Sequence, residues 1–238
     1  MRFLTVSDEI VPSIYSLNIK GRFEGIQGVL SCGDLPYYYL EFIVTMLGVP
    51  LYYIYGNHDT TEHTSGGEEL TEARGCTLIE DRVITQNGWL IGGLGGSIRY
   101  NDDDAPQYTE QQMLMRIWRM TPQLLLNKVR HGRHIDILLT HAPPLGIHNG
   151  PSRPHKGFKS LLMFMDRFQP RYLIHGHIHR SYGYSSVTES RYQDTLIVNT
   201  AGHRLLSVAD VPTAPMQTTL DGKPILDLTP ERKNGRES

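Results

Sequence analysis

An amide, an imidazole and a carboxylate follow one another at Asn57, His58 and Asp59, directly after Gly56 and an apolar run over residues 49–55. The run is rich in residues that favour strands, so these polar groups lie where a strand ends. Open α/β sheets hold their ligands at that edge. Taken alone, the four residues also fit a polar turn, because Gly and Asn tolerate positive φ and Asp caps turns.

Four other strand-like runs end in residues of the same kind. They stop at Asp8, at Gly33 and Asp34, at His141, and at the segment Gly176, His177, Ile178, His179. Core packing does not explain why five apolar runs all end in metal-binding side chains. We therefore interpret these residues as a convergent ligand shell.

The side chains in this shell are two carboxylates, one asparagine amide and three imidazoles, without a thiolate. This composition suits Mn, Fe or Zn better than Ca or an iron–sulfur cluster. It suffices for two ions if one carboxylate bridges them at the roughly 3.5–4 Å of two-metal hydrolases. Such a pair activates a water or hydroxide for in-line attack on a phosphoryl group, and a further histidine can protonate the leaving oxygen.

The combined motifs resemble the calcineurin-like metallophosphoesterase family. They are Asp8, GD at 33–34, GNHD at 56–59, His141 after an apolar strand, and GHIH at 176–179. The resemblance extends from residue 3 to about residue 200. It implies an α/β fold, a four-layer αββα sandwich of two mixed β-sheets flanked by helices, with two metal ions at the strand ends.

The resemblance also implies a role for each matching residue. The ligands of the first metal would be Asp8, Asp34 and His179, and those of the second would be Asn57, His141, His177 and the bridging Asp34. His58 would donate a proton or stabilise the transition state. Asp59 would either orient His58 or cap the turn.

The sequence departs from the family at Ile10, where the pattern of Asp, any residue, His requires a ligand. Three interpretations follow: water completes the first metal's shell, Glu9 swings in, or the site is mononuclear or vestigial. Strand alternation would direct Glu9 away from Asp8, although a loop beginning there would remove that constraint. In each case the first site is expected to be the weaker one.

Two functions from different classes remain open. One is a metal-dependent phosphoesterase that hydrolyses a monoester or diester of a small phosphorylated substrate. The other is a non-catalytic scaffold, like the retromer phosphoesterase-like subunit, with a degenerate first metal site. The presence of His58 favours the enzyme, since a scaffold has no chemical need for it. A nuclease is less favoured because the chain lacks a basic stripe.

Residues 143–156 follow the ligand His141 and are predicted to form a loop. Candidates there for contacts with phosphate or substrate are His148, Arg153, His155 and Lys156. The alternative is that they are ordinary solvated loop residues.

The elements that must position these groups alternate between strands and helices. We expect strands at residues 2–7, 28–32, 51–55, 135–140 and 172–175, and helices at 35–47, 109–120, 121–130 and 158–168.

The remaining segments are predicted to be loops, turns and shorter strands. Residues 60–69 are predicted to form a surface loop. Residues 76–79 and 82–85, followed by a tight turn at Asn87 and Gly88 into residues 89–91, suit a hairpin or meander. Residues 195–198 and 204–208 would be closing antiparallel strands. The glycines at 92–96 indicate close packing, since a P-loop lysine is missing.

Length and composition fit one large domain over residues 1–208, followed by a tail or irregular flap over 209–238. The 238 residues carry a net charge of −2 and are 39% hydrophobic, which argues against a dominant attraction to nucleic acid or membrane lipid.

Cys32 and Cys76 form no disulfide pattern. Without a signal peptide or a long apolar span, a cytoplasmic location is expected. The sequence gives no indication of the oligomeric state.

Overall fold

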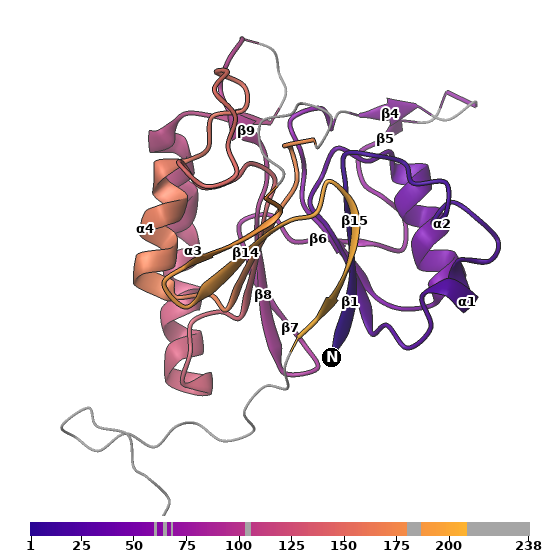
Figure 1. Cartoon of the computed structure of the whole chain (residues 1–238), viewed down its shortest axis with the longest axis horizontal. Helices are drawn as coiled ribbons and strands as arrows, with labels where there is room; N and C mark the ends of the chain where they lie inside the picture. Colours follow the sequence, from indigo (N-terminus) through magenta and orange to yellow (C-terminus); the bar gives the residue numbers. More distant parts are fainter. Residues whose placement is uncertain (60, 64–65, 68, 103–105, 180–186, 209–238) are drawn as a thin grey trace, which may run out of the picture.

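The computed structural model describes the chain except residues 60, 64–65, 68, 103–105, 180–186 and 209–238. Two mixed β-sheets lie face to face, with helices on the outer face of each (Figure 1). Helices α1 (Ile19–Arg22) and α2 (Tyr37–Leu47) cover the first sheet, and α3 (Glu110–His131) and α4 (Lys159–Phe168) cover the second. The four-layer α/β sandwich implied by the sequence motifs is confirmed.

The first sheet has the strand order β15-β1-β2-β3-β6. Its strands are β1 (Arg2–Ser7), β2 (Gly28–Ser31), β3 (Leu51–Tyr53), β6 (Thr77–Leu78) and β15 (Gly202–Ser207). The strands β1, β2, β3 and β6 are parallel, and β15 is antiparallel to β1. The carboxyl ends of β1, β2 and β3 therefore meet at one edge of the sheet.

The second sheet has the order β13-β14-β12-β11-β8-β7. Its strands are β7 (Val83–Gln86), β8 (Trp89–Leu94), β11 (Ile137–Thr140), β12 (Tyr172–His175), β13 (Glu189–Tyr192) and β14 (Thr195–Asn199). The four central strands are parallel, and β7 and β13 are antiparallel edges. Two further small pairs are β4 (Glu62–His63) with β5 (Glu69–Leu70), and β9 (Ser97–Ile98) with β10 (Gln107–Tyr108).

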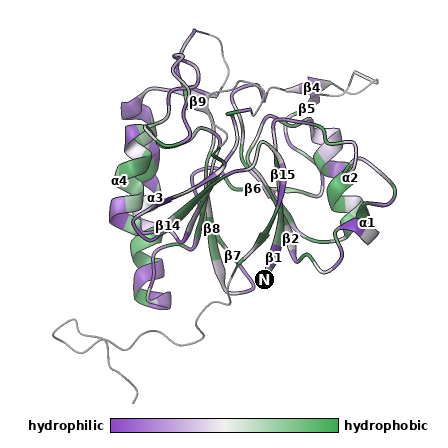
Figure 2. Ribbon diagram, in the orientation of Figure 1, coloured by the Kyte–Doolittle hydropathy of each residue, from purple (hydrophilic) through white to green (hydrophobic). Residues whose placement is uncertain are grey.

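The central strands are apolar on both faces because each face is covered. In β11, Ile137 and Leu139 pack between the sheets with Phe3 and Leu30 of the first sheet. Leu138 points the other way, into the core beneath α3 and α4. Figure 2 shows the same pattern as hydrophobic strands between helices with mixed surfaces. Several buried polar side chains of these strands, such as Ser7, Ser31 and Thr140, lie at the strand ends.

The predicted hairpin is formed by residues 82–85 and the run after Asn87 and Gly88, since β7 lies antiparallel to β8. Residues 76–79 do not join it, because their strand β6 lies in the other sheet, parallel to β3. The chain crosses between the sheets at Glu80 and Asp81, and the buried Arg116 forms ion pairs with both carboxylates. The predicted turn at Asn87 and Gly88 is confirmed, with φ of 48° and 81°, joining β7 to β8.

Two other local predictions are corrected by the structure. The helices predicted at 109–120 and 121–130 are the single helix α3, with Pro122 inside it. Pro122 lacks the N–H that would bond to the carbonyl of Trp118, but Trp118 is 66% exposed, so water can serve that carbonyl. The predicted surface loop at 60–69 contains the short pair β4 and β5.

The predicted closing antiparallel strands correspond to β14 and β15, which close different sheets. β15 is antiparallel to β1 in the first sheet, and β14 lies parallel to β12 and antiparallel to β13 in the second. The predicted close packing of the glycine run is confirmed, since a Cβ at Gly93 would overlap Ile54 and Ile79. The predicted tail or flap at 209–238 lies outside the described residues.

Within the described part of the chain, no helix is both long and apolar enough to cross a membrane. Both cysteines are free, as expected.

Candidate metal centre

The polar strand ends meet at one edge of the sandwich because the backbone turns sharply there. Asp8, Asp34 and His177 have positive φ of 64°, 56° and 66°. Side chains other than glycine rarely adopt this conformation, which is a strain typical of functional sites. A Cβ at Gly56 would overlap the Asp34 carboxylate, so glycine there lets two of the loops touch. The tight turns thus aim the side chains at a common point.

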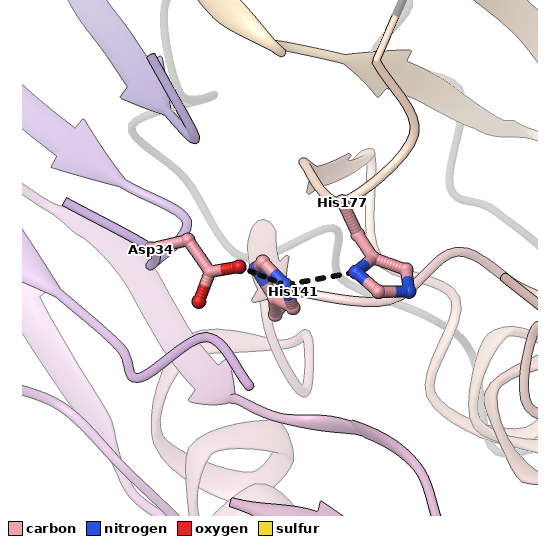
Figure 3. A group of neighbouring side chains, drawn as sticks. All are labelled: Asp34, His141 and His177. Atoms are coloured by element: carbon pink, nitrogen blue, oxygen red, sulfur yellow. Dashed lines mark hydrogen bonds and ion pairs between the residues drawn. The ribbon is translucent and has the colours of Figure 1, made fainter. Parts of the chain in front are cut away.

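Asp34, His141 and His177 form a compact group in which one donor atom from each residue lies within 4.8 Å of the others. His141 Nε2 is 3.3 Å from Asp34 Oδ2 and 3.1 Å from His177 Nδ1. Figure 3 shows the three side chains directed toward one another from separate elements. This group can hold a metal ion.

Backbone carbonyls fix which ring nitrogens face the group. The Nδ1–H of His141 donates to the carbonyl of Cys32 at 2.7 Å, and the Nε2–H of His177 donates to the carbonyl of Pro154 at 2.9 Å. His141 Nε2 and His177 Nδ1 are therefore left as ligand atoms. Asn57 Oδ1 is 3.0 Å from the same His141 Nε2. The atoms that face one another here are acceptors with lone pairs and few hydrogens between them, so a cation can bind among them.

The electrostatics of the group favour positive charge. Burial tends to lower the pKa of His141, but the carboxylates of Asp34 and Asp8 outweigh it and raise the pKa to about 10. Burial tends to raise the pKa of Asp34, yet the charge and hydrogen bond of His141 hold it well below its usual range. Burial, with the charge of His141, lowers the pKa of His177 to about 3. A bound divalent ion would take the place of the His141 proton.

The predicted ligands of the first metal are more open. His179 Nε2 lies 3.7 Å from Asp8 Oδ1, and His179 Nδ1 lies 3.2 Å from Glu9 Oε1. The Glu9 side chain is 52% exposed and the His179 side chain 24%. Ile10 is directed to solvent, at 41% exposure. β1 ends at Ser7 and Asp8 has positive φ, so strand alternation does not govern Glu9.

Asp8 itself is held in place, since its carboxylate accepts hydrogen bonds from the backbone N–H of His177 at 2.9 and 3.0 Å and from the Ser7 hydroxyl. Burial raises the pKa of Asp8. Asp8 therefore joins the first sheet to the loop that carries His177 and His179.

His58 and Asp59 both contact Asp34. The His58 residue is exposed, and its backbone N–H donates to Asp34 Oδ1 at 2.7 Å. Asp59 Oδ2 accepts from the N–H groups of Asp34 at 2.9 Å and Gly56 at 2.6 Å. Burial, followed by the charge of Asp34, raises the pKa of Asp59 to about 6. These contacts give Asp59 the capping role.

The loop candidates fall into different environments. His148 is buried, donates from Nδ1 to His175 Nε2 at 2.9 Å, and accepts from the Ser190 hydroxyl at 2.8 Å. The His155 ring lies 5.2 Å from the His177 ring. Arg153 and Lys156 are exposed and line a cleft. The structure thus brings His155 beside the compact group and places His148 in a buried chain.

Some contributors to the centre were not predicted. The carbonyls of Cys32 and Pro154 orient the two ligand histidines, and the hydroxyl of Tyr100 accepts from the Asn57 amide at 3.4 Å. No residue-type signal marks a carbonyl for such a role. The only sequence signal for Pro154 was its place in the predicted loop that follows His141.

A model of the family described as calcineurin-like phosphoesterase matches residues 20–181. Two similar proteins from Caenorhabditis elegans are the UPF0046 protein K07C11.7, 39% identical over 45% of the chain, and the UPF0046 protein T07D4.2, 33% identical over 44%. The aligned segments cover 33% and 24% of those relatives, so the chain spans about a third or less of their length.

Among solved structures, TT1561 of Thermus thermophilus has a similar fold. The TM-score is 0.54, with 13% sequence identity over 84% of this chain and 89% of that one. At this identity the likeness concerns the fold alone.

Proposed function

The chain belongs to the calcineurin-like phosphoesterase family, and we propose that it is a metal-dependent hydrolase of phosphate esters. Its substrate would be a small phosphorylated molecule, as a monoester or a diester. The observation that carries the proposal is the convergence of His141 Nε2 and His177 Nδ1 on Asp34, with the opposite ring nitrogens held by backbone carbonyls. Family membership and this donor set support the same chemistry.

The donor set fits two divalent ions of the Mn, Fe or Zn type. The buried ligands Asn57, His141 and His177 would hold one ion, with Asp34 as the bridge. Asp8 and His179 would hold the other, with Glu9 in place of the histidine that Ile10 replaces. Bound ions of this kind act as Lewis acids that activate water and neutralise phosphoryl oxygens.

The protein's own residues supply orientation and a proton. The Asp34 carboxylate accepts from the backbone N–H of His58 at 2.7 Å, which holds this residue beside Asp34. His58 is exposed, so a substrate can reach its imidazole. A protonated His58 would donate to the leaving oxygen as the phosphorus–oxygen bond breaks.

A reconstitution experiment tests this proposal. Protein freed of metal with a chelator is supplied with Mn²⁺, Fe²⁺ or Zn²⁺, and its metal content and its hydrolysis of para-nitrophenyl phosphate and bis-para-nitrophenyl phosphate are measured. We expect metal-dependent turnover that His141→Ala abolishes. The control His131→Ala changes an exposed histidine at the end of α3 and should behave as the unaltered protein.

The outcomes separate the two functions that the sequence left open. Metal binding without turnover of either ester would favour the non-catalytic scaffold with a degenerate first site. Failure to bind any of the three metals would contradict both the metal centre and the hydrolase. The cytoplasmic location remains a prediction.

A further inference from the structure

A cleft of about 620 Å³ opens beside the metal centre. Its walls come from β9 and β10, from the first turns of α3 and α4, and from the loop after His141. The basic side chains that line it are Arg99, Arg153, Lys156 and Lys159. Ile98, Tyr108 and Leu145 add apolar and aromatic surface. The volume is in the range of small-molecule sites, roughly 300–1,000 Å³.

The four cations of this cleft, which we call the basic cleft, form no ion pair with the described residues. Among the described residues, no carboxylate lies within ion-pair distance of any of them. Glu110 also lines the cleft, but its carboxylate accepts from the backbone N–H groups of Lys159 at 2.6 Å and Ser160 at 3.1 Å. By contrast, the guanidinium groups of Arg116, Arg133 and Arg204 all contact carboxylates.

Both walls of the basic cleft continue into the metal centre. Arg153 precedes Pro154, whose carbonyl accepts from His177 at 2.9 Å. Arg99 precedes Tyr100, whose hydroxyl accepts from the Asn57 amide at 3.4 Å. Neighbouring Cα atoms are about 3.8 Å apart, so each wall lies one residue from a contact with a predicted ligand. Two residues that line the cleft, Arg99 and Arg153, are therefore chain neighbours of residues that contact the predicted ligands.

The loop that carries Arg153 and Lys156 is internally bonded. Its backbone N–H groups at Gly150, His155 and Lys156 donate to carbonyls within the same segment at 2.9, 3.1 and 3.3 Å. The Ser152 hydroxyl and His155 Nδ1 are 2.7 Å apart. The two basic side chains are thus presented from a defined turn, which lowers the entropy cost of binding an anion.

We propose that the basic cleft binds a second phosphate group of the substrate, so that the preferred substrates carry two or more phosphates. This inference rests on the proposed hydrolysis at the metal centre. Several unpaired cations around one space are suited to phosphate because charge-assisted hydrogen bonds are strong. Tyr108 and Ile98 would contact the part of the substrate between its phosphates.

The first measurement is binding of inorganic tripolyphosphate to the full chain freed of metal, by calorimetry. We expect Arg99→Ala/Lys159→Ala to weaken this binding about tenfold or more, since two charge-assisted contacts are lost. The matched control Arg119→Ala/Arg130→Ala removes the same charge from exposed positions of α3 and should leave the affinity unchanged. The variant Arg99→Lys/Lys159→Arg should recover most of it.

The second measurement is inhibition of para-nitrophenyl phosphate turnover by tripolyphosphate in metal-loaded protein. We expect competitive inhibition, with an inhibition constant that rises about tenfold in Arg99→Ala/Lys159→Ala. Equal binding in the cleft variant and its control would overturn the proposal. Non-competitive inhibition would overturn it too, because the cleft would then be separate from the substrate site. Selective loss of binding in a protein without turnover would support the cleft and reject only the proposed hydrolase.

Discussion

The two halves of the metal centre differ in how much of their geometry is built into the fold. In the buried half, Asn57, His141 and His177 are 1%, 0% and 5% exposed, and each ring has a backbone carbonyl behind it. In the open half, the side chains of Glu9 and His179 are 52% and 24% exposed, although that of Asp8 is buried. Ordered ligands bind metal more tightly because less freedom is lost on binding.

The comparison therefore predicts an uneven pair of sites. The ion in the buried half should be retained through dialysis, and the ion in the open half should exchange.

Replacing a ligand in the buried half should have the largest effect. His141→Ala removes the ring that contacts Asp34, Asn57 and His177 together, so the ion of that half should be lost. Turnover should fall by at least the roughly 10²–10⁴ that one positioned group contributes. Elemental analysis and initial rates measure both. His179→Ala should instead remove only the exchangeable ion; equal loss from both variants would contradict the difference between the halves.

His58→Ala should separate catalysis from metal binding. We expect both ions to remain, since the hydrogen bond from His58 to Asp34 is made by the backbone N–H, which alanine keeps. Turnover of esters with poor leaving groups should fall by about 10²–10⁴, because those leaving oxygens need a proton. Rates on a series of phenyl phosphates of increasing leaving-group pKa provide the measurement. A small, equal loss across the series would remove His58 from proton transfer.

The metal affinity of the open half is expected to depend on Glu9 and Ile10. If Glu9 is a ligand, Glu9→Ala should weaken Mn²⁺ binding at that half about tenfold, and Ile10→His should strengthen it. Electron paramagnetic resonance titration of Mn²⁺ into chelated protein measures the affinity. The chemically similar Glu9→Gln distinguishes charge from bulk.

The opposite result is equally informative. A single retained ion in Glu9→Ala, in Ile10→His and in the unaltered protein would mean that the open half holds no metal. The mechanism with two ions would then be wrong for this chain.

The smallest effect concerns pH. Burial, followed by the charge of His148, lowers the pKa of His175 to about 3. In the unfolded chain His175 binds a proton near the ordinary pKa of about 6.5, whereas in the folded chain it stays neutral down to about 3. The folded state therefore keeps its full stability above about pH 6.5 and loses stability as the pH falls toward 3. This residue should contribute up to about 1.4 kcal/mol per pH unit to that loss.

Urea unfolding of metal-free protein at about pH 7.5 and about pH 5.5 measures this term. His175→Gln should reduce the stability lost between the two values by roughly 1–2 kcal/mol, although its total stability is lower. The exposed His131→Gln should leave the difference unchanged. An unaltered difference in His175→Gln would mean that His175 is not kept neutral in the folded chain.

Local chemistry allowed much of this protein to be predicted from its sequence. Apolar runs that stop at polar residues predicted where strands end, and the structure has strands that end shortly before these residues. The residues are Asp8, Asp34, Asn57, His141 and His177. The turn at Asn87 and Gly88 and the end of α2 at Gly48 depend on φ values that few residues adopt. Such features are decided by residues close together in the chain, so a short stretch of sequence contains them.

Contacts between distant segments were decided only by the tertiary structure. Nothing near residues 76–79 shows that they join β3 rather than the strand at 82–85, because a short apolar run pairs equally well with either. The same holds for the carbonyls that orient His141 and His177, since every residue has a carbonyl and only packing selects Cys32 and Pro154. Exposure also follows from packing. The sequence therefore indicated both sets of candidate ligands, and only the structure distinguished the buried half from the open one.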